Sequence, residues 1–521
     1  MEIILSVDLG TSGIKVGLVK INGEIIGWEQ EPIDLYLFDG GGAEQSPQQW
    51  WDAFLNTSKR LIKRYPAYAK EIAAICCSTQ GEGTIAVDEN GDPLHNCILW
   101  MDMRGARSLK KQFKGLINYE GVSISQVIRW IRLTGGMPSL TGKDPAGHML
   151  YIKDYMPEIY KKTYKFLNVI DYFNMKLTGR FVTTYDSILT SWVTDNRNPE
   201  KIEYSPILLK RSGIDIDKFP QIVAPIDVIG NLKPDIAKDL ELSDKVKVVA
   251  GSIDTTAAAI GSAAVEDYDL HLYLGTSSWL AAHLPYKKTD IIHSMASVPC
   301  AIPSKYLLIG LQATAGGNLV FLKDNILYHK DELLLEAQKP DIYKVLDQIA
   351  QRVPAGSNGI IYTPWIWGER APVDNRFIRA GLYNISLKNN REDIIRAFFE
   401  GVALNTRWLL GPIEKFMKKK TQKINIVGGG AQSDTWCQIF ADVLGVKIYQ
   451  VEDPILANMR GAAWIASVGL GKLSFSDIPS LVKYKKIYEP KSDIKKIYDK
   501  LFDQFKEIYK RMKGYYTRIN S

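Results

Sequence analysis

Short apolar runs separated by glycine and polar turns open the chain. Ile3 to Val7 is apolar except for Ser6, the next six residues (Asp-Leu-Gly-Thr-Ser-Gly) are mostly polar or small, and Ile14 to Val19 is mostly apolar again. This pattern predicts a β-hairpin, and not the strand-to-helix turn of a dinucleotide-binding fold or a P-loop. Ser46 as N-cap and Pro47 in the first turn predict a helix start. Ile72 to Cys77 is apolar throughout and predicts a buried strand.

The opening pattern recurs near the middle of the chain. Leu274-Gly275-Thr276-Ser277 repeats Leu9-Gly10-Thr11-Ser12 at an offset of 265 residues, and each copy follows an apolar run. Four residues are a weak match, but their place at the start of each half suggests duplicated domains facing one another across a cleft. We expect a first domain over residues 1–247 and a second over residues 248–480.

A third glycine turn lies near the end of the second domain. The apolar run from Ile424 leads into Gly428-Gly429-Gly430, and a helix is predicted from about Ser433 to Leu444. Such a turn places backbone N–H groups at a helix N-terminus, which is a natural site for an anion or a nucleotide.

Charge is concentrated in the carboxy-terminal tail. The net charge is +7, and residues 483–521 alone carry 12 Lys or Arg against 5 Asp or Glu, so the rest of the chain is balanced. The tail has large apolar residues at helical spacing: Ile494, Ile497, Tyr498, Leu501, Phe502, Phe505, Ile508, Tyr509 and Met512. We expect residues 481–521 to form an amphipathic helix packed on the body, in preference to a helix on a membrane or on nucleic acid.

Composition is that of an ordinary folded chain. Hydrophobic residues make up 46% and charged residues 24% of 521 residues. The sequence has no apolar run of about 18 residues and no basic leader before its first apolar run, so we expect neither a transmembrane helix nor a signal peptide. The five cysteines form no regular framework, which favours free thiols in a cytoplasmic protein without a zinc site.

Small residues and carboxylates together suggest phosphate chemistry. Two Gly-Thr-Ser loops, one in each half, suit a polyphosphate held by both domains. Asp8 directly precedes the first loop, a common place for a residue that holds hydrated Mg²⁺, and Lys15 is a candidate cation. Asp254 lies among small residues, where it is either a general base or the N-cap of the alanine-rich helix that follows. The spacing alone does not separate these two roles.

Polar residues at strand ends in the first half suggest a sugar site. They are Gln80, Gly81 and Glu82 after one strand, and Trp100 and Asp102 after another. Amide and carboxylate groups hydrogen-bond sugar hydroxyls, and a Trp ring stacks on a sugar face. Ordinary turn chemistry explains the same residues equally well.

The ordered motifs resemble those of the FGGY family of carbohydrate kinases, and within it they are most similar to xylulose kinases. The motifs are DLGTSGIK (8–15), ILWMDMRGA (98–106), AGSIDTTAAAIG (250–261), YLGTSS (273–278), GERAP (368–372) and VGGGAQSDTWCQIFADVLG (427–445). The resemblance implies an α/β fold of two actin-like (ribonuclease-H-like) domains around a central cleft. It also implies ATP- and Mg²⁺-dependent phosphorylation of a small-molecule sugar or polyol, with a homodimer as a family-level expectation.

The resemblance also assigns roles to residues. Asp254 matches the family's catalytic base, and Asp8 the carboxylate near the metal and the phosphates. The matched nucleotide positions are Gly10, Thr11, Ser12, Lys15, Gly275, Thr276, Gly316, Gly317, Gly429, Gly430 and Asp434. The sugar is expected near Gln80, Gly81, Glu82, Trp100, Asp102 and Asp254.

The departures from the family pattern fall on the sugar side. Xylulose kinases usually have Met-His where this chain has Gly81-Glu82, and a Lys is usual where this chain has His148. Glu82 would repel an acidic sugar, so we expect a neutral ketose or polyol and not gluconate. Two rival hypotheses are an actin-like ATPase that acts on a protein partner and a catalytically silent sugar sensor.

Overall fold

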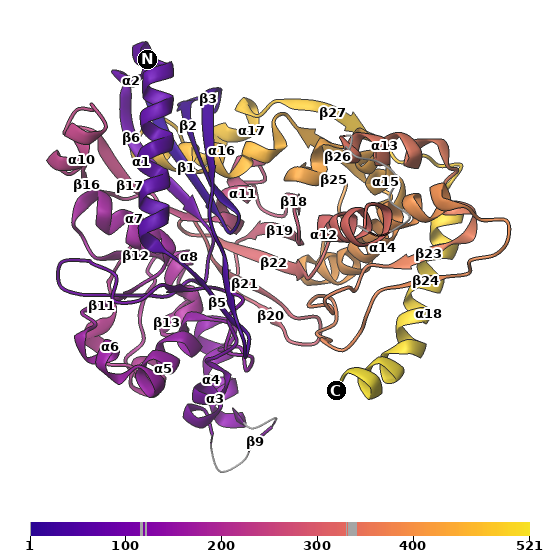
Figure 1. Cartoon of the computed structure of the whole chain (residues 1–521), viewed down its shortest axis with the longest axis horizontal. Helices are drawn as coiled ribbons and strands as arrows, with labels where there is room; N and C mark the ends of the chain where they lie inside the picture. Colours follow the sequence, from indigo (N-terminus) through magenta and orange to yellow (C-terminus); the bar gives the residue numbers. More distant parts are fainter. Residues whose placement is uncertain (1, 115–117, 120–121, 330, 332–340) are drawn as a thin grey trace.

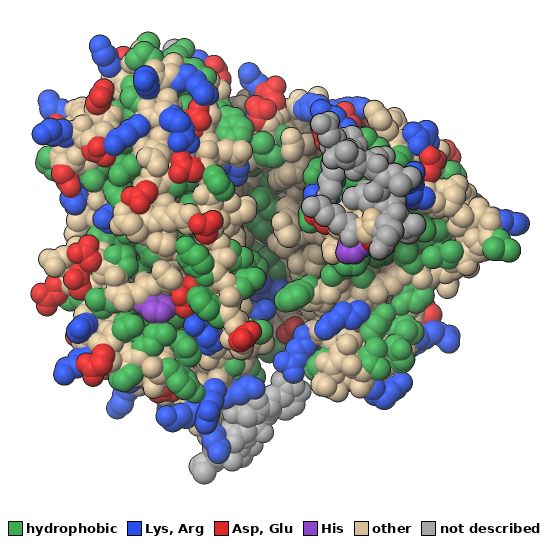
Figure 2. Space-filling view, in the orientation of Figure 1, with side chains coloured by type: hydrophobic (Ala, Val, Ile, Leu, Met, Phe, Trp, Pro, Cys, Tyr) green, Lys and Arg blue, Asp and Glu red, His purple; other side chains and the backbone are tan. Residues whose placement is uncertain are grey.

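Two halves, each built on one mixed β-sheet, make up the protein (Figure 1). The computed structural model describes residues 2–114, 118–119, 122–329, 331 and 341–521. The surface is hollowed between the two halves (Figure 2). Of the described helices, none is both long enough and apolar enough to cross a membrane. All five cysteines lie in the described ranges and are buried free thiols.

The first sheet has β1 near its centre. In spatial order its strands are β16 (Val228–Asn231), β17 (Lys247–Ile253), β6 (Ile72–Thr79), β1 (Ile3–Gly10), β2 (Gly13–Lys20) and β3 (Ile25–Pro32). β1 is antiparallel to β2 and parallel to β6. The predicted hairpin and the predicted buried strand at residues 72–77 are therefore confirmed.

The second sheet repeats the arrangement of the first. In spatial order its strands are β20 (Thr289–Asp290), β21 (Met295–Pro299), β22 (Tyr306–Gln312), β19 (Ser278–Leu284), β18 (Leu270–Leu274), β25 (Lys423–Val427), β26 (Lys447–Val451) and β27 (Tyr484–Tyr488). β18 is antiparallel to β19 and parallel to β25, as β1 is to β2 and β6. The predicted duplication is confirmed, and the two Gly-Thr-Ser loops occupy equivalent places in the two halves.

Two crossing helices fill the layer between the sheets. They are α11 (Asp254–Gly261) and α16 (Ala457–Gly469). A Cβ atom on Gly261 would lie 1.8 Å from the carbonyl oxygen of Ala457, and one on Gly461 would lie 2.0 Å from that of Ala257. Glycine at both positions is what lets the two backbones approach so closely. The apolar cluster around this crossing includes residues of both sheets.

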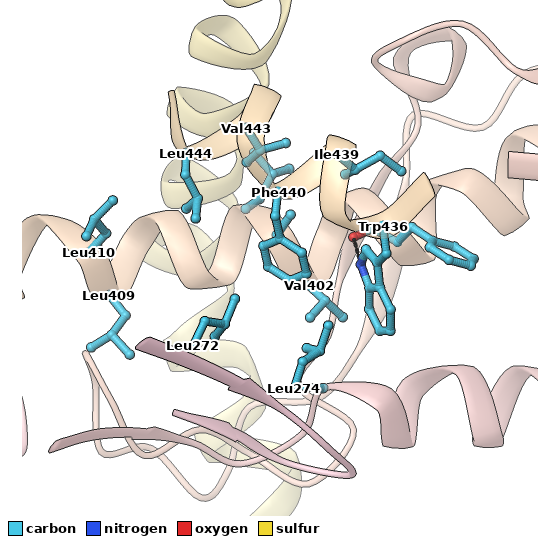
Figure 3. Packing of buried hydrophobic residues seen from close by; sticks show 14 of the residues in the cluster. Leu272, Leu274, Val402, Leu409, Leu410, Trp436, Ile439, Phe440, Val443 and Leu444 are labelled. Atoms are coloured by element: carbon cyan, nitrogen blue, oxygen red, sulfur yellow. Dashed lines mark hydrogen bonds between the residues drawn. The ribbon is translucent and has the colours of Figure 1, made fainter. Parts of the chain in front are cut away.

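Further helices cover the outer face of each sheet. They are α1 (Pro47–Arg64) and α7 (Val169–Thr178) in the first half, and α14 (Arg391–Met417) and α15 (Asp434–Leu444) in the second. The side chain of Ser46 caps α1 by accepting a hydrogen bond from the N–H of Gln49, as predicted. In the second half, Val402 of α14 and Phe440 of α15 pack over Leu272 of β18 (Figure 3).

A separate lobe of the first half has its own apolar cluster. Its helices are α3 (Ala106–Gln112), α4 (Ile124–Thr134), α5 (Pro145–Tyr155), α6 (Pro157–Lys162) and α9 (Pro206–Ser212). The strand β12 (Val182–Thr184) and the short helix α8 (Tyr185–Ile188) connect this lobe to the end of β17. β17 leads directly into Asp254, the first residue of α11.

The predicted boundary at residue 247 differs from the sheet arrangement. β17 pairs with β6 in the first sheet, so residues 248–253 belong with the first half. Helix α16, which comes late in the chain, packs against β1 and β6 of the first sheet. An apolar strand looks the same in either half, and only its pairing partner shows where it lies.

The basic tail is part strand and part helix. β27 pairs with the edge strand β26, and α18 (Lys495–Asn520) packs on the second half. The hydroxyl of Tyr498 in α18 donates to Glu400 (2.8 Å) and accepts from Arg396 (3.1 Å). The predicted helix over residues 481–521 is wrong for residues 484–488, which form β27. These residues are extended because β26 offers them backbone hydrogen bonds along its free edge.

Candidate active site

The turn between β1 and β2 is tied to the predicted sugar side. The hydroxyl of Thr11 donates to Gln80 (2.8 Å) and accepts from the indole N–H of Trp100 (3.2 Å). The carbonyl of Thr11 accepts from Gln45 (2.7 Å), which in turn accepts from the amide of Gln80 (2.8 Å). Gly10 and Ser12 belong to the same turn, and Ser12 is exposed. The first loop is therefore held in place by the residues beside it.

Asp8 lies just before this loop and is almost fully buried. One carboxylate oxygen accepts from Lys15 (3.1 Å) and the other from Asn458 of α16 (3.2 Å). Lys15, predicted to be a cation for phosphate, thus forms an ion pair with Asp8. A carboxylate has about four acceptor positions, so Asp8 keeps capacity for water or a further donor.

The second loop, which carries Gly275 and Thr276, lies against the start of α12 (Gly316–Phe321). The N–H of Gly316 donates to the carbonyl of Gly275 (2.8 Å), and that of Gly317 to the carbonyl of Thr276 (3.0 Å). A Cβ atom on Gly316 would lie 2.6 Å from the carbonyl oxygen of Gly275, so glycine is required there. Four of the predicted nucleotide positions are brought together in this way.

The third glycine turn joins β25 to α15 and lies beside the second loop. Gly428 has a φ of +94°, and a Cβ atom there would lie 2.7 Å from the carbonyl oxygen of Leu274, the last residue of β18. A Cβ atom on Gly429 would have no described atom within 4 Å, so this glycine borders open space. Asp434, the first residue of α15, forms an ion pair with Lys485 (2.7 Å).

Asp254 is the first residue of α11 and is half-buried. The N-cap position belongs to Ile253, so Asp254 is not the helix cap that the sequence left open. Burial, followed by the charge of Asp8, raises the pKa of Asp254 to about 7, and the charges of Glu82 and Asp186 contribute. A carboxylate with such a pKa is suited to accept a proton near neutral pH.

Tyr273 connects the second half electrostatically with these acids. It lies in β18, and its ring stacks on Trp279 with 3.9 Å between ring centroids. Burial raises the pKa of Tyr273, and the next largest causes are the charges of Asp8 and Asp254. Charges act in this way only on nearby groups, so the hydroxyl of Tyr273 lies close to both acids.

Three charged side chains lie near one another around Glu82. Burial raises the pKa of Glu82, whereas the charges of Arg370 and Lys143 lower it. Burial lowers the pKa of Lys143, as does the charge of Arg370. The charge of Asp374 also acts on Lys143 and raises its pKa. The second half therefore contributes a cation, Arg370, to the predicted sugar side.

The remaining predicted sugar residues are fixed in the first half. Asp102 is fully buried and accepts from the backbone N–H of Ala43 (2.8 Å) and from the side chain of Arg104 (2.9 Å). A Cβ atom on Gly81 would be in ordinary contact with Ile253 at 3.5 Å, so a methyl group fits there. His148 is fully buried against Thr84 (3.1 Å), and burial lowers its pKa to about 4. The departure from the family pattern at His148, where a Lys is usual, therefore lies in the buried core of the first half.

Several polar neighbours of the site had no role in the sequence analysis. They are Gln45, Lys143, Asp186, Arg370 and Asn458. Arg370 lies in the GERAP motif, and Lys143 lies five residues before His148. The motifs could therefore indicate that these residues lie near the site, but not which side chains they face. Asn458 contacts Asp8 across 450 residues of sequence, and no local pattern indicates that contact.

The sequence matches two family profiles in chain order. The N-terminal domain of the FGGY family of carbohydrate kinases matches residues 3–261, and the C-terminal domain of the same family matches residues 270–470. The two matches cover most of the chain, and the break between them lies between α11 and β18.

Known proteins of similar sequence and fold include kinases for two sugars. A xylulose kinase from Staphylococcus epidermidis is 28% identical over 521 residues, covering 98% of this chain and 97% of its own. A gluconokinase from Bacillus subtilis is 26% identical over 521 residues, covering 99% and 97%. The crystal structure of a gluconate kinase from Lactobacillus acidophilus has a TM-score of 0.85 and 25% identity, covering 99% of each chain. The predicted two-domain α/β fold is confirmed.

Proposed function

Because the chain belongs to the FGGY family of carbohydrate kinases, we propose that it transfers the γ-phosphoryl group of ATP to a hydroxyl of a neutral ketose, such as xylulose. The observation that carries this proposal is the carboxylate of Asp254, half-buried near Asp8 with a pKa of about 7. A base with such a pKa takes the hydroxyl proton while the phosphoryl group transfers in line.

The three glycine turns support a nucleotide site on the second half. In this proposal the phosphates lie between the first loop and Gly275-Thr276, where backbone N–H groups approach anions closely. The nucleoside lies against Gly429 and Gly430, where the open space beside Gly429 leaves room. Asp434 borders the same turn from the first residue of α15.

Asp8 and the phosphates of a bound nucleotide would together hold Mg²⁺, which would neutralise charge on the transferring phosphoryl group. No group of three or more His, Cys, Asp or Glu side chains in the described ranges is arranged to hold a metal ion. Mg²⁺ is commonly bound by one or two carboxylates, substrate phosphates and several waters, which requires no larger cluster. Asp8, with one hydrogen bond on each oxygen, retains acceptor capacity for a water on that ion.

The charges around the acceptor site bear on the choice of sugar. The charges of Asp8 and Glu82 both act on Asp254, and an acidic sugar would add a further negative charge. This favours a neutral ketose or polyol. The second candidate is an aldonate such as gluconate, because the charges of Arg370 and Lys143 act on Glu82.

The test is ADP release with Mg-ATP across xylulose, ribulose, pentitols, glycerol and gluconate. Asp254→Asn should lower sugar-dependent release by about 10³-fold, the scale of general base catalysis, while ATP binding by calorimetry stays unchanged. Near-normal turnover in this variant would remove Asp254 from the base role. Release that no sugar stimulates would instead favour the ATPase hypothesis.

Two further variants separate the sugar classes. Arg370→Gln should raise KM for gluconate about tenfold or more if an aldonate carboxylate binds there, since charge-assisted hydrogen bonds are strong. The same variant should change KM for a neutral sugar much less. Glu82→Gln is the matched variant: it should raise KM for a neutral sugar that binds through Glu82, and lower KM for gluconate. A higher kcat/KM for gluconate than for every neutral sugar in wild type would overturn the neutral-sugar proposal.

A further inference from the structure

A buried carboxylate from a distant segment holds the turn that carries Asp254. Asp186, in α8, is 1% exposed. One of its oxygens accepts from the backbone N–H of Ile253 (3.0 Å) and from the hydroxyl of Thr256 (2.5 Å). Its other oxygen accepts from the hydroxyl of Thr184 (2.7 Å). The two segments joined here are 67 to 70 residues apart, and Ile253 and Thr256 lie on either side of Asp254.

The turn around Asp254 needs support from outside. The pairing of β17 with β6 is irregular just before it, between Val249 and Ser252. Gly251 has a φ of +75°, and a Cβ atom there would lie 2.2 Å from the carbonyl oxygen of Cys77. The helix that follows has Ile253 at its N-cap position, whose side chain cannot accept a hydrogen bond.

Asp186 supplies what the local sequence lacks. Its carboxylate lies at the N-terminus of α11, an eight-residue helix, where the helix dipole favours negative charge. Its bonds to residues on both sides of Asp254 restrict how strand and helix meet. With 1% of its surface exposed, Asp186 has no access to a sugar or nucleotide.

We propose that Asp186 is a positioning residue for phosphoryl transfer, which holds Asp254 in the orientation required to accept the hydroxyl proton. This inference rests on the proposed role of Asp254 as the base. A displacement of about 1 Å at a reacting group costs on the order of 10²-fold in rate. Loss of Asp186 should therefore lower kcat with little change in KM for ATP.

The experiment compares Asp186→Ala with Asp186→Asn. The Ala variant removes the acceptor, and we expect kcat to fall about 10²-fold. The Asn variant can place its carbonyl oxygen where Ile253 and Thr256 donate, so we expect it to recover kcat to within about fivefold of wild type. A merely structural role would not give this recovery together with an unchanged KM for ATP.

Asp393→Asn is the matched control. Asp393 is also a buried carboxylate at a helix N-terminus, that of α14 in the second half, and accepts from the backbone N–H of Asn390 (3.0 Å) and the side chain of Asn358 (2.9 Å). We expect it to keep kcat within about twofold of wild type, even where its unfolding midpoint falls. If Asp186→Ala does not fold, Thr256→Val removes one of the same bonds from the helix side and should lower kcat by itself.

The outcomes separate this inference from the proposed function. If Asp254→Asn is inactive but Asp186→Ala has a normal kcat, the positioning role of Asp186 is overturned and the base role of Asp254 is not. Normal turnover in Asp254→Asn would overturn both. An equal loss of kcat in Asp393→Asn and Asp186→Ala would also refute the positioning role, since it would assign the loss to a general effect of removing a buried carboxylate.

Discussion

The crossing of α11 and α16 at two glycines makes a quantitative prediction about Gly261→Ala. The added methyl would lie 1.8 Å from the carbonyl oxygen of Ala457 and 2.6 Å from its carbonyl carbon. Both are backbone atoms, so no side-chain rotation relieves the clash. One helix has to retreat by about 1.6 Å to reach 3.4 Å, where ordinary contact begins.

That retreat affects both stability and catalysis. Overpacking of a tight core costs about 1–3 kcal/mol. The same movement displaces Asp254 at the start of α11 and Asn458, the Asp8 partner, at the start of α16. Since a misplacement of about 1 Å costs on the order of 10²-fold in rate, we expect kcat to fall by that factor while KM for ATP changes little.

The assay is steady-state kinetics with denaturant unfolding on the same preparations. Gly514→Ala is the control, because Gly514 lies inside α18 and the nearest described atom to a Cβ there would be a side-chain nitrogen of Arg518, 3.9 Å away. Alanine is the better helix former by about 1 kcal/mol, so the control should be at least as stable as wild type. Wild-type kcat and stability in Gly261→Ala would refute the reasoning, because they would show that the two helices separate at no cost.

Three further predictions concern protonation and the tail. Because Asp254, as the proposed base, must be deprotonated and has a pKa of about 7, kcat/KM should fall below about pH 7; a fall only near pH 4 would contradict the proposed role. His283 is fully buried and its pKa is lowered to about 4, below the unfolded value of about 6.5. Between these two pH values the unfolded chain binds a proton on His283 that the folded protein does not bind. The contribution of His283 to stability is therefore fully present above pH 6.5 and is lost as pH falls toward 4. His283→Asn should therefore reduce the acid sensitivity of stability by about 2 kcal/mol between pH 7 and pH 5, measured by urea unfolding; unchanged sensitivity would contradict this. Tyr498→Phe removes a buried partner of Glu400 and should cost about 1–3 kcal/mol in the same assay; no loss would mean that α18 is not held through this bond.

Much of the fold was predictable because its signals are local. Apolar runs on either side of a glycine turn gave the first hairpin, and the repeat at residues 274–277 indicated the second half. The predicted boundary at residue 247 differed from the structure because strand β17 pairs with β6. Pairing depends on which edge a strand meets, and that information is not contained in the strand itself.

The site follows the same division. The sequence determined the residue types of the proposed catalytic site, Asp8 and Asp254 beside small residues, because close approach to phosphate requires glycine and short side chains. Only the tertiary structure decided their partners. Asn458 contacts Asp8 across 450 residues, and Asp186 holds the turn of Asp254 across 67. The pKa of Asp254 is likewise a tertiary property, since burial and neighbouring charges set it, and both depend on how distant segments pack.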